Sequence, residues 1–166
     1  MNADRDSLAD RDTLADRETL AALFEGAPRF LDRLIAAGPF ERPEALFAAA
    51  RSLAHDMPEE EQVELIDAHP RLGAAPGSVS AMSYVEQGYD RATGTPVDVA
   101  AELERLNDAY EARYGFRYCV FVAGRSREAL LPGMAAALDA DRSTELHRAL
   151  DAVVDIAIDR HAKLSG

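Results

Sequence analysis

Apolar residues along this chain recur three and four positions apart, which is the spacing of one face of an α-helix. The longest regular pattern places Val99, Leu103, Leu106 and Tyr110 on one face, and Gly115 ends it. Proline at the start of a run and glycine after it are typical of helix boundaries. Helices are therefore predicted for a segment that carries Leu20 and Leu23, for residues 28–38, from Pro43 onward, and for residues 58–69, 80–91, 95–115, 126–138 and 143–163.

One stretch, Phe116 to Val122, has the aromatic and β-branched composition of a β-strand. A single strand without a partner cannot form a sheet, so we expect an extended segment that passes through a helical core. The predicted fold class is all-α: a single-domain multi-helix bundle with one short extended segment near 116–122.

The N-terminus carries a six-residue repeat, SLADRD from Ser7 and TLADRE from Thr13. A period of six puts successive leucines about 120° apart on a helix, so they form no single apolar face. We predict that residues 1–12 form a flexible tail and that residues 13–166 form one helical domain. Thr13 and Asp16 could form a capping box for the first helix of that domain.

Two ionisable side chains are predicted on apolar helix faces, on either side of a turn that contains proline and glycine. His69 lies four residues after Leu65 on the same face, and Pro70 ends that helix. Glu86 lies four residues after Met82 in the following helix. A buried imidazole or carboxylate is costly unless it is hydrogen-bonded or takes part in chemistry, so the two residues are candidates for a site.

Three further polar residues extend this candidate site. Ser83 and Gln87 lie within one turn of Glu86, and Arg160 lies near the apolar face of the last helix, where an inward arginine usually binds an anion. Structural roles are open for all of them. His69 could bond the last carbonyls of its helix, Glu86 could pair with an arginine, and Arg160 could lie between core and solvent.

Composition excludes several classes of protein. A net charge of −12 argues against nucleic acid and anionic membranes as partners. No apolar run approaches the roughly 18 residues of a membrane span, and no secretory signal is recognisable. The single cysteine, Cys119, forms no internal disulfide and fits the reducing cytoplasm. The histidines and the cysteine lack zinc-site spacing, so we expect no metal. Together, these features lead us to expect a cytoplasmic protein with a small-molecule substrate.

Five short motifs occur in a fixed order along the chain. They are His-Pro-x-Leu-Gly at 69–73, Ser-x-x-Glu-Gln at 83–87, Leu-Asn-x-x-Tyr at 106–110, Tyr-Gly-Phe at 114–116, and Val-Ala-Gly-Arg-Ser-Arg-Glu at 122–128 before a final helix with an arginine near its end. In the order of these motifs and in their residue types, the chain resembles the OHCU decarboxylases, which act on 2-oxo-4-hydroxy-4-carboxy-5-ureidoimidazoline in urate breakdown. The resemblance covers roughly residues 20–164. Two departures touch the expected pocket wall: Arg117-Tyr118 stands where the family usually has Pro-Phe, and the loop between Gly73 and Ser83 is short.

The resemblance implies an all-helical homodimer that uses neither a metal nor an organic cofactor. It implies that His69 and Glu86 are the catalytic pair. The residues implied to bind the substrate are Pro70, Ser83, Gln87, Tyr118, Cys119 and Arg160, with Tyr118 and Cys119 acting through backbone groups.

The implied reaction is a decarboxylation that gives (S)-allantoin. The substrate has a C=N bond beside the carbon that loses CO₂ and so supplies its own electron sink. His69 would transfer a proton, Glu86 would bind N–H groups and orient His69, and Arg160 would bind a carboxylate or carbonyl oxygen. Two other functions stay open. One is a related decarboxylase with a changed substrate, to which Arg117 points, and the other is a non-catalytic helical interaction module.

Overall fold

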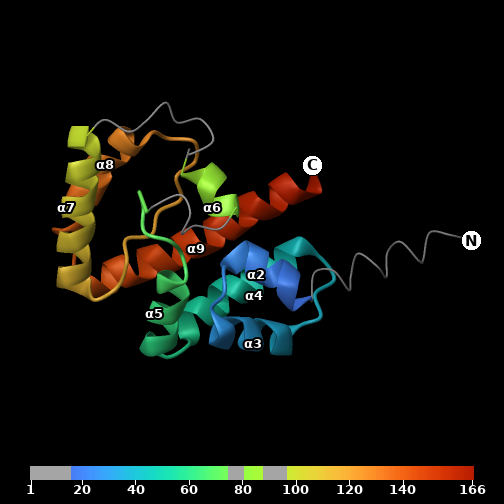
Figure 1. Ribbon diagram of the computed structural model, residues 1–166. Coiled ribbons are helices and arrows are strands. Elements are labelled where there is room, and N and C mark those ends of the chain that lie inside the picture. The colour runs from blue at the N-terminus through green and yellow to red at the C-terminus, as the bar shows by residue number, and fades with distance from the viewer. Residues whose placement is uncertain (1–15, 75–80, 88–96) are drawn as a thin grey trace, which may run out of the picture. The chain divides into compact units, whose positions relative to one another are not determined.

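The computed structural model describes residues 16–74, 81–87 and 97–166 (Figure 1). Its helices are α2 (Arg17–Phe24), α3 (Pro28–Ala37), α4 (Pro43–Asp56), α5 (Glu59–Asp67), α6 (Ala81–Glu86), α7 (Val97–Tyr114), α8 (Arg127–Ala137) and α9 (Arg142–Ser165). The described residues contain no β-strand, which confirms the predicted all-α class. None of the helices in these ranges combines the length and the apolar character that crossing a membrane requires.

Proline, glycine and serine set several helix boundaries where the sequence predicts them. α3 begins at Pro28 and α4 at Pro43, positions where the missing N–H of proline costs nothing. Gly115 follows α7 with a φ of 80°, the left-handed conformation that glycine adopts without strain. Ser126 caps α8, since its side-chain oxygen accepts a hydrogen bond from the N–H of Ala129 at 3.1 Å.

The predicted start of the first helix falls partly outside the described residues. α2 begins at Arg17 with Asp16 at its N-cap, and Thr13 of the predicted capping box lies outside the described ranges. Residues 1–12, predicted as a flexible tail, also lie outside them, as do the predicted helix start at Thr95 and Pro96. The extent of one domain over 13–166 stays a prediction.

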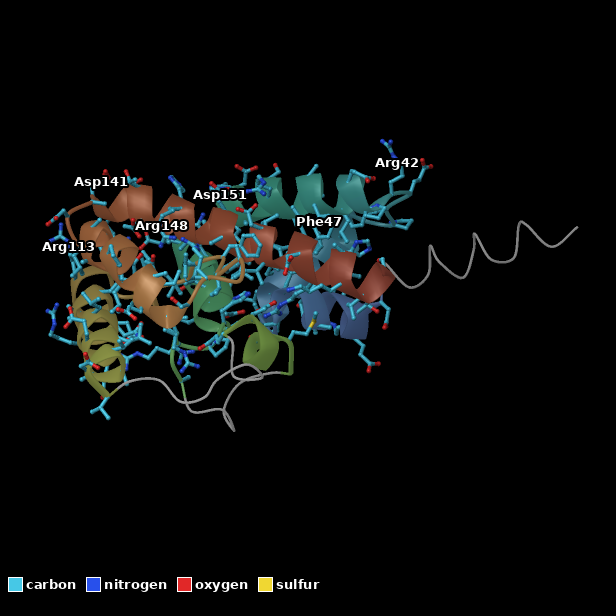
Figure 2. The ribbon with its side chains drawn as sticks, turned by 90° about the horizontal axis from the view of Figure 1, so that it is seen from above. Arg42, Phe47, Arg113, Asp141, Arg148 and Asp151 are labelled. Atoms are coloured by element: carbon cyan, nitrogen blue, oxygen red, sulfur yellow. The ribbon has the colours of Figure 1, made fainter. Side chains whose placement is uncertain are left out.

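The chain forms two compact units. Unit 1 consists of Met1–Ala68 and Val153–Gly166, and unit 2 of His69–Ala152, so α9 contributes residues to both. In unit 1, α3 packs against α2, α4 and α5. Phe24 meets Phe30 with ring centroids 5.1 Å apart. Phe47, labelled in Figure 2, lies on α4. The centroid of its ring is 5.6 Å from that of His161 on α9. Aromatic rings thus join the helices of this core.

In unit 2, α7 lies beside α8 (Figure 1). The ring of Tyr110 on α7 is 4.6 Å from that of Tyr114, 5.8 Å from that of Phe116 and 5.1 Å from that of Tyr118. Residues 117–122 form neither helix nor strand, and Phe116, Tyr118 and Val122 are buried. The predicted short segment inside a helical core is therefore confirmed, and it packs against α7.

Candidate functional site

His69 lies just beyond the end of α5, whose last residue is Asp67. The expectation that His69 occupies the last turn of this helix is wrong, because a residue that precedes a proline avoids the α conformation and Pro70 follows. His69 is nevertheless buried, with 5% of its surface exposed. Its carbonyl oxygen accepts a hydrogen bond from Nη1 of Arg117 at 3.1 Å.

Side chains from two other segments hold the backbone that follows His69. Gln87, the residue after α6, accepts a hydrogen bond from the N–H of Gly73 at 2.7 Å and donates one to the carbonyl of Arg71 at 3.3 Å. Asn107, buried on α7, donates from Nδ2 to the carbonyl of Leu72 at 2.9 Å. These bonds fix the turn at three successive residues, 71–73, and unit 2 thereby brings the first three sequence motifs into contact.

α6 presents the second predicted group of site residues. Ser83 is 3% exposed, and its carbonyl accepts a hydrogen bond from the N–H of Gln87 at 2.9 Å. Met82 and Glu86 are half-buried. Glu86 therefore keeps part of its surface accessible to a ligand, while Tyr89 of the predicted apolar stripe lies outside the described residues.

The predicted substrate-binding residues Tyr118 and Cys119 are 7% and 5% exposed and rest on a buried ionic network. Nη1 of Arg148 donates to the carbonyl of Cys119 at 2.9 Å, and Nε of Arg148 donates to Glu145 at 2.9 Å. The guanidinium carbon lies 4.9 Å from the centroid of the Tyr118 ring. The hydroxyl of Tyr110 donates to the same Glu145 carboxylate at 2.6 Å. Figure 2 shows Arg148 on the part of α9 that belongs to unit 2.

The surroundings shift the pKa values of both tyrosines and of Arg148 in this network. Burial raises the pKa of Tyr110, and the hydrogen bond to the Glu145 carboxylate raises it further. Burial also raises the pKa of Tyr118, against the opposing charge of Arg148. For Arg148, burial lowers the pKa, but the charge and hydrogen bond of Glu145 together with the nearby Tyr118 and Tyr110 outweigh burial, and the pKa is raised. Both phenols therefore stay protonated as the charged pair holds the 117–119 segment.

Neither Glu145 nor Arg148 is singled out by the main apolar face of the last helix. The available signal is a second stripe, in which Ala149 and Ala152 follow Glu145 by four and seven residues. Glu145, Ala149 and Ala152 are 3%, 0% and 7% exposed. The burial of Glu145 could therefore have been predicted from the alanines that follow it on the same face of the helix.

Arg160 belongs to unit 1 and is buried, with 1% of its surface exposed. Nη1 donates to the carbonyl of Ala22 at 3.0 Å and to that of Leu23 at 3.4 Å, which are among the last carbonyls of α2. Nη2 forms an ion pair with Glu25 at 2.9 Å. The guanidinium thus closes the C-terminus of α2, where the macrodipole favours a positive charge.

Unit 2 also holds a cavity of about 330 Å³ beside the turn. Its described lining residues are Arg71, Leu72, Gly73, Ala74, Ala100, Leu103, Glu104, Asn107 and Arg127. None of these is among the predicted site residues. The cavity borders the turn on its α7 side, because Ala100, Leu103, Glu104 and Asn107 lie on that helix. Within the described ranges, no group of three or more histidine, cysteine or acidic side chains is placed to hold a metal ion.

Comparison with known proteins gives one consistent family. The family model described as OHCU decarboxylase matches residues 10–162. A 2-oxo-4-hydroxy-4-carboxy-5-ureidoimidazoline decarboxylase of Haloferax volcanii is 30% identical over 135 residues, which are 81% of this chain and 80% of that protein. The uric acid degradation bifunctional protein of Bacillus subtilis is 29% identical over 136 residues, and the match spans 82% of this chain but 27% of that protein. An OHCU decarboxylase solved in the presence of (S)-allantoin superposes with a TM-score of 0.72 at 21% identity, over 90% of this chain and 97% of that one.

Proposed function

Because this chain belongs to the OHCU decarboxylase family, we propose that it decarboxylates 2-oxo-4-hydroxy-4-carboxy-5-ureidoimidazoline to (S)-allantoin in urate degradation. The observation that carries the proposal is the family match over residues 10–162, which includes every residue of the candidate site. The likeness extends to relatives whose names assign them this substrate or uric acid degradation. The enzyme is then a carbon–carbon lyase.

The substrate itself provides the electron sink for this reaction. Loss of CO₂ leaves an electron pair on a carbon that carries a hydroxyl and neighbours a C=N bond, and the pair enters that bond as its nitrogen takes a proton. The resulting enol then loses its hydroxyl proton, while the neighbouring carbon gains a proton on one face. The protein has to orient the carboxylate and control these proton transfers, so no organic cofactor or metal is required.

We assign the proton transfers to His69, whose burial and fixed backbone suit a group that must meet one substrate atom. Half-buried Glu86 accepts hydrogen bonds from the ureido or ring N–H groups and orients the imidazole. The substrate-binding residues of this proposal, taken from the family resemblance, are Pro70, Ser83, Gln87, the backbone at Tyr118 and Cys119, and Arg160. For Gln87 this contact is added to its bonds with the turn, and for Arg160 to its ion pair with Glu25.

In the experiment, urate oxidase and hydroxyisourate hydrolase generate the unstable substrate in the assay mixture. Circular dichroism follows the appearance of (S)-allantoin with and without this protein. Acceleration and a single enantiomer are expected for the native chain, and His69→Ala and Glu86→Ala should abolish both while far-ultraviolet dichroism keeps the helical signal. His147→Ala, a change of an exposed histidine on α9, serves as the matched control and should leave the rate unchanged. A native protein that leaves the rate and the enantiomeric ratio at background values would refute the proposed activity.

Two finer properties belong to the same proposal. We propose a homodimer, which the family resemblance supports, and a cytoplasmic location, which the lone buried Cys119 suits because a reducing compartment keeps it a thiol. Light scattering coupled to size exclusion measures the first and fractionation of the source cells measures the second. A monomer across the working concentration range, or a secreted protein, would contradict them.

A further inference from the structure

We propose that Arg117 is a positioning residue for His69, an inference that rests on the proposed function of that histidine. Nη1 of Arg117 donates a hydrogen bond to the carbonyl oxygen of His69 at 3.1 Å. The contact is part-buried and joins residues 48 positions apart in the chain. Arg117 thus contacts the backbone of the catalytic residue and acts on the imidazole through it.

The position of this carbonyl makes the contact effective. The backbone of α5 gives its last bond at Ala68, whose N–H donates to the carbonyl of Glu64, and Pro70 has no N–H to continue the pattern. In the peptide plane after His69, the carbonyl oxygen is therefore the only backbone group that can form a hydrogen bond, and Arg117 binds it. Holding that plane sets the direction of the Cα–Cβ bond of His69, from which the two side-chain torsions place the imidazole.

Arg117 can hold this plane because its own segment is anchored. Next to it, Tyr118 packs on Tyr110, and the carbonyl of Cys119 accepts a hydrogen bond from Arg148. The hydrogen bond from Arg117 therefore runs from the buried core of unit 2 to the residue that carries the imidazole. Side-chain hydrogen bonds from Gln87 and Asn107 hold the backbone of residues 71–73 in the same way.

The residue type at this position is one of the two departures of this chain from the pattern that it resembles. The family usually has Pro-Phe where this chain has Arg117-Tyr118, and a proline side chain has no hydrogen-bond donor. The bond to the His69 carbonyl is thus a property of the arginine. Lysine at the same place would retain a donor on a flexible stem, and alanine would remove it.

The test compares Arg117→Ala and Arg117→Lys with Arg105→Ala, which removes an exposed arginine paired with Glu102 on α7. Loss of orientation lowers kcat, so we expect Arg117→Ala to lose about 10- to 100-fold in kcat while KM changes by less than about twofold. Arg117→Lys should recover part of the loss, and Arg105→Ala should match the native enzyme. A raised KM with native kcat would show a direct substrate contact and would overturn the positioning role.

A second readout does not depend on turnover. The imidazole resonances of His69 are identified by their absence in His69→Ala, and a single sharp set is expected in the native protein. Arg117→Ala should broaden or double that set, and Arg117→Lys should restore most of it. Unchanged His69 resonances in Arg117→Ala would overturn the proposal even if the native protein showed no decarboxylase activity, so the two failures are distinguishable.

Discussion

The side-chain oxygen of Gln87 accepts a hydrogen bond from the backbone N–H of Gly73 at 2.7 Å. One residue before Gln87 is Glu86, and four residues before Gly73 is His69, so this bond directly joins the two segments that carry the proposed catalytic pair. The amide nitrogen of the same side chain donates to the carbonyl of Arg71 at 3.3 Å. One glutamine thus satisfies a donor and an acceptor of the turn at once.

Gln87→Glu should keep the bond from the Gly73 N–H and lose the bond to the Arg71 carbonyl, because a carboxylate accepts but does not donate. We expect kcat to fall about tenfold through misplacement of the turn. Gln87→Ala removes both bonds and should cost more. Steady-state kinetics in the coupled dichroism assay measures the series, and equal rates for all three proteins would contradict a role of Gln87 in holding the turn.

Gly73→Ala should destabilise the protein for two reasons. Its φ of 81° strains a residue with a Cβ, and that Cβ would lie 2.5 Å from Cδ2 of Leu103. We expect a loss of about 2 kcal/mol in the free energy of unfolding, measured with urea. Gly115→Ala is the matched control, since it has a φ of 80° but no atom within 4 Å of the added Cβ, and it should lose about 1 kcal/mol. A smaller loss for Gly73→Ala than for Gly115→Ala would contradict the close approach to Leu103.

Local signals in the sequence account for most of the fold. Proline and glycine fix backbone torsions wherever they occur, so Pro28, Pro43 and Gly115 mark helix boundaries that the structure confirms. Proline also disfavours the α conformation in the residue that precedes it, and for this reason Pro70 excludes His69 from α5. Helix class and most boundaries are thus predictable because they depend on neighbours in the chain.

The contacts of the site depend on distant residues and are not predictable from spacing. The sequence pointed to His69, Gln87 and Asn107 through motifs, yet spacing did not pair Gln87 with Gly73 or Arg117 with His69. These bonds form only after the segments around residues 70, 87 and 117 fold into unit 2. The catalytic roles of His69 and Glu86 rest on the family match and remain predictions until variants are measured.

Arg160→Ala should reduce both stability and substrate affinity. The guanidinium is buried and pairs with Glu25, so its removal leaves a mostly buried carboxylate and uncapped carbonyls at the end of α2. We expect a loss of about 3 kcal/mol in the free energy of unfolding. If Arg160 also binds a substrate oxygen, KM should rise severalfold under conditions where the variant remains folded.

Two control variants separate these effects for Arg160. Glu25→Gln weakens the same ion pair without removing the guanidinium, so it should lower stability while KM stays native. Arg51→Ala removes a half-exposed pair with Asp155 and should change the free energy of unfolding by less than about 1 kcal/mol. A native KM in folded Arg160→Ala would confine Arg160 to its structural contacts in unit 1.

Tyr110→Phe should make the stability of the protein less sensitive to alkaline pH. Burial, reinforced by the bond to Glu145, raises the pKa of Tyr110 in the folded state, whereas an unfolded tyrosine ionises near pH 10. Above about pH 10 the unfolded state therefore binds fewer protons than the folded state, and the contribution of Tyr110 to stability is lost as pH rises. Near pH 8 the variant should be about 2 kcal/mol less stable, because a hydrogen bond to a buried carboxylate is missing. Urea unfolding of both proteins at about pH 8 and pH 11 should show that the difference between their free energies of unfolding decreases as pH rises. A constant difference would show that groups other than Tyr110 cause the alkaline sensitivity.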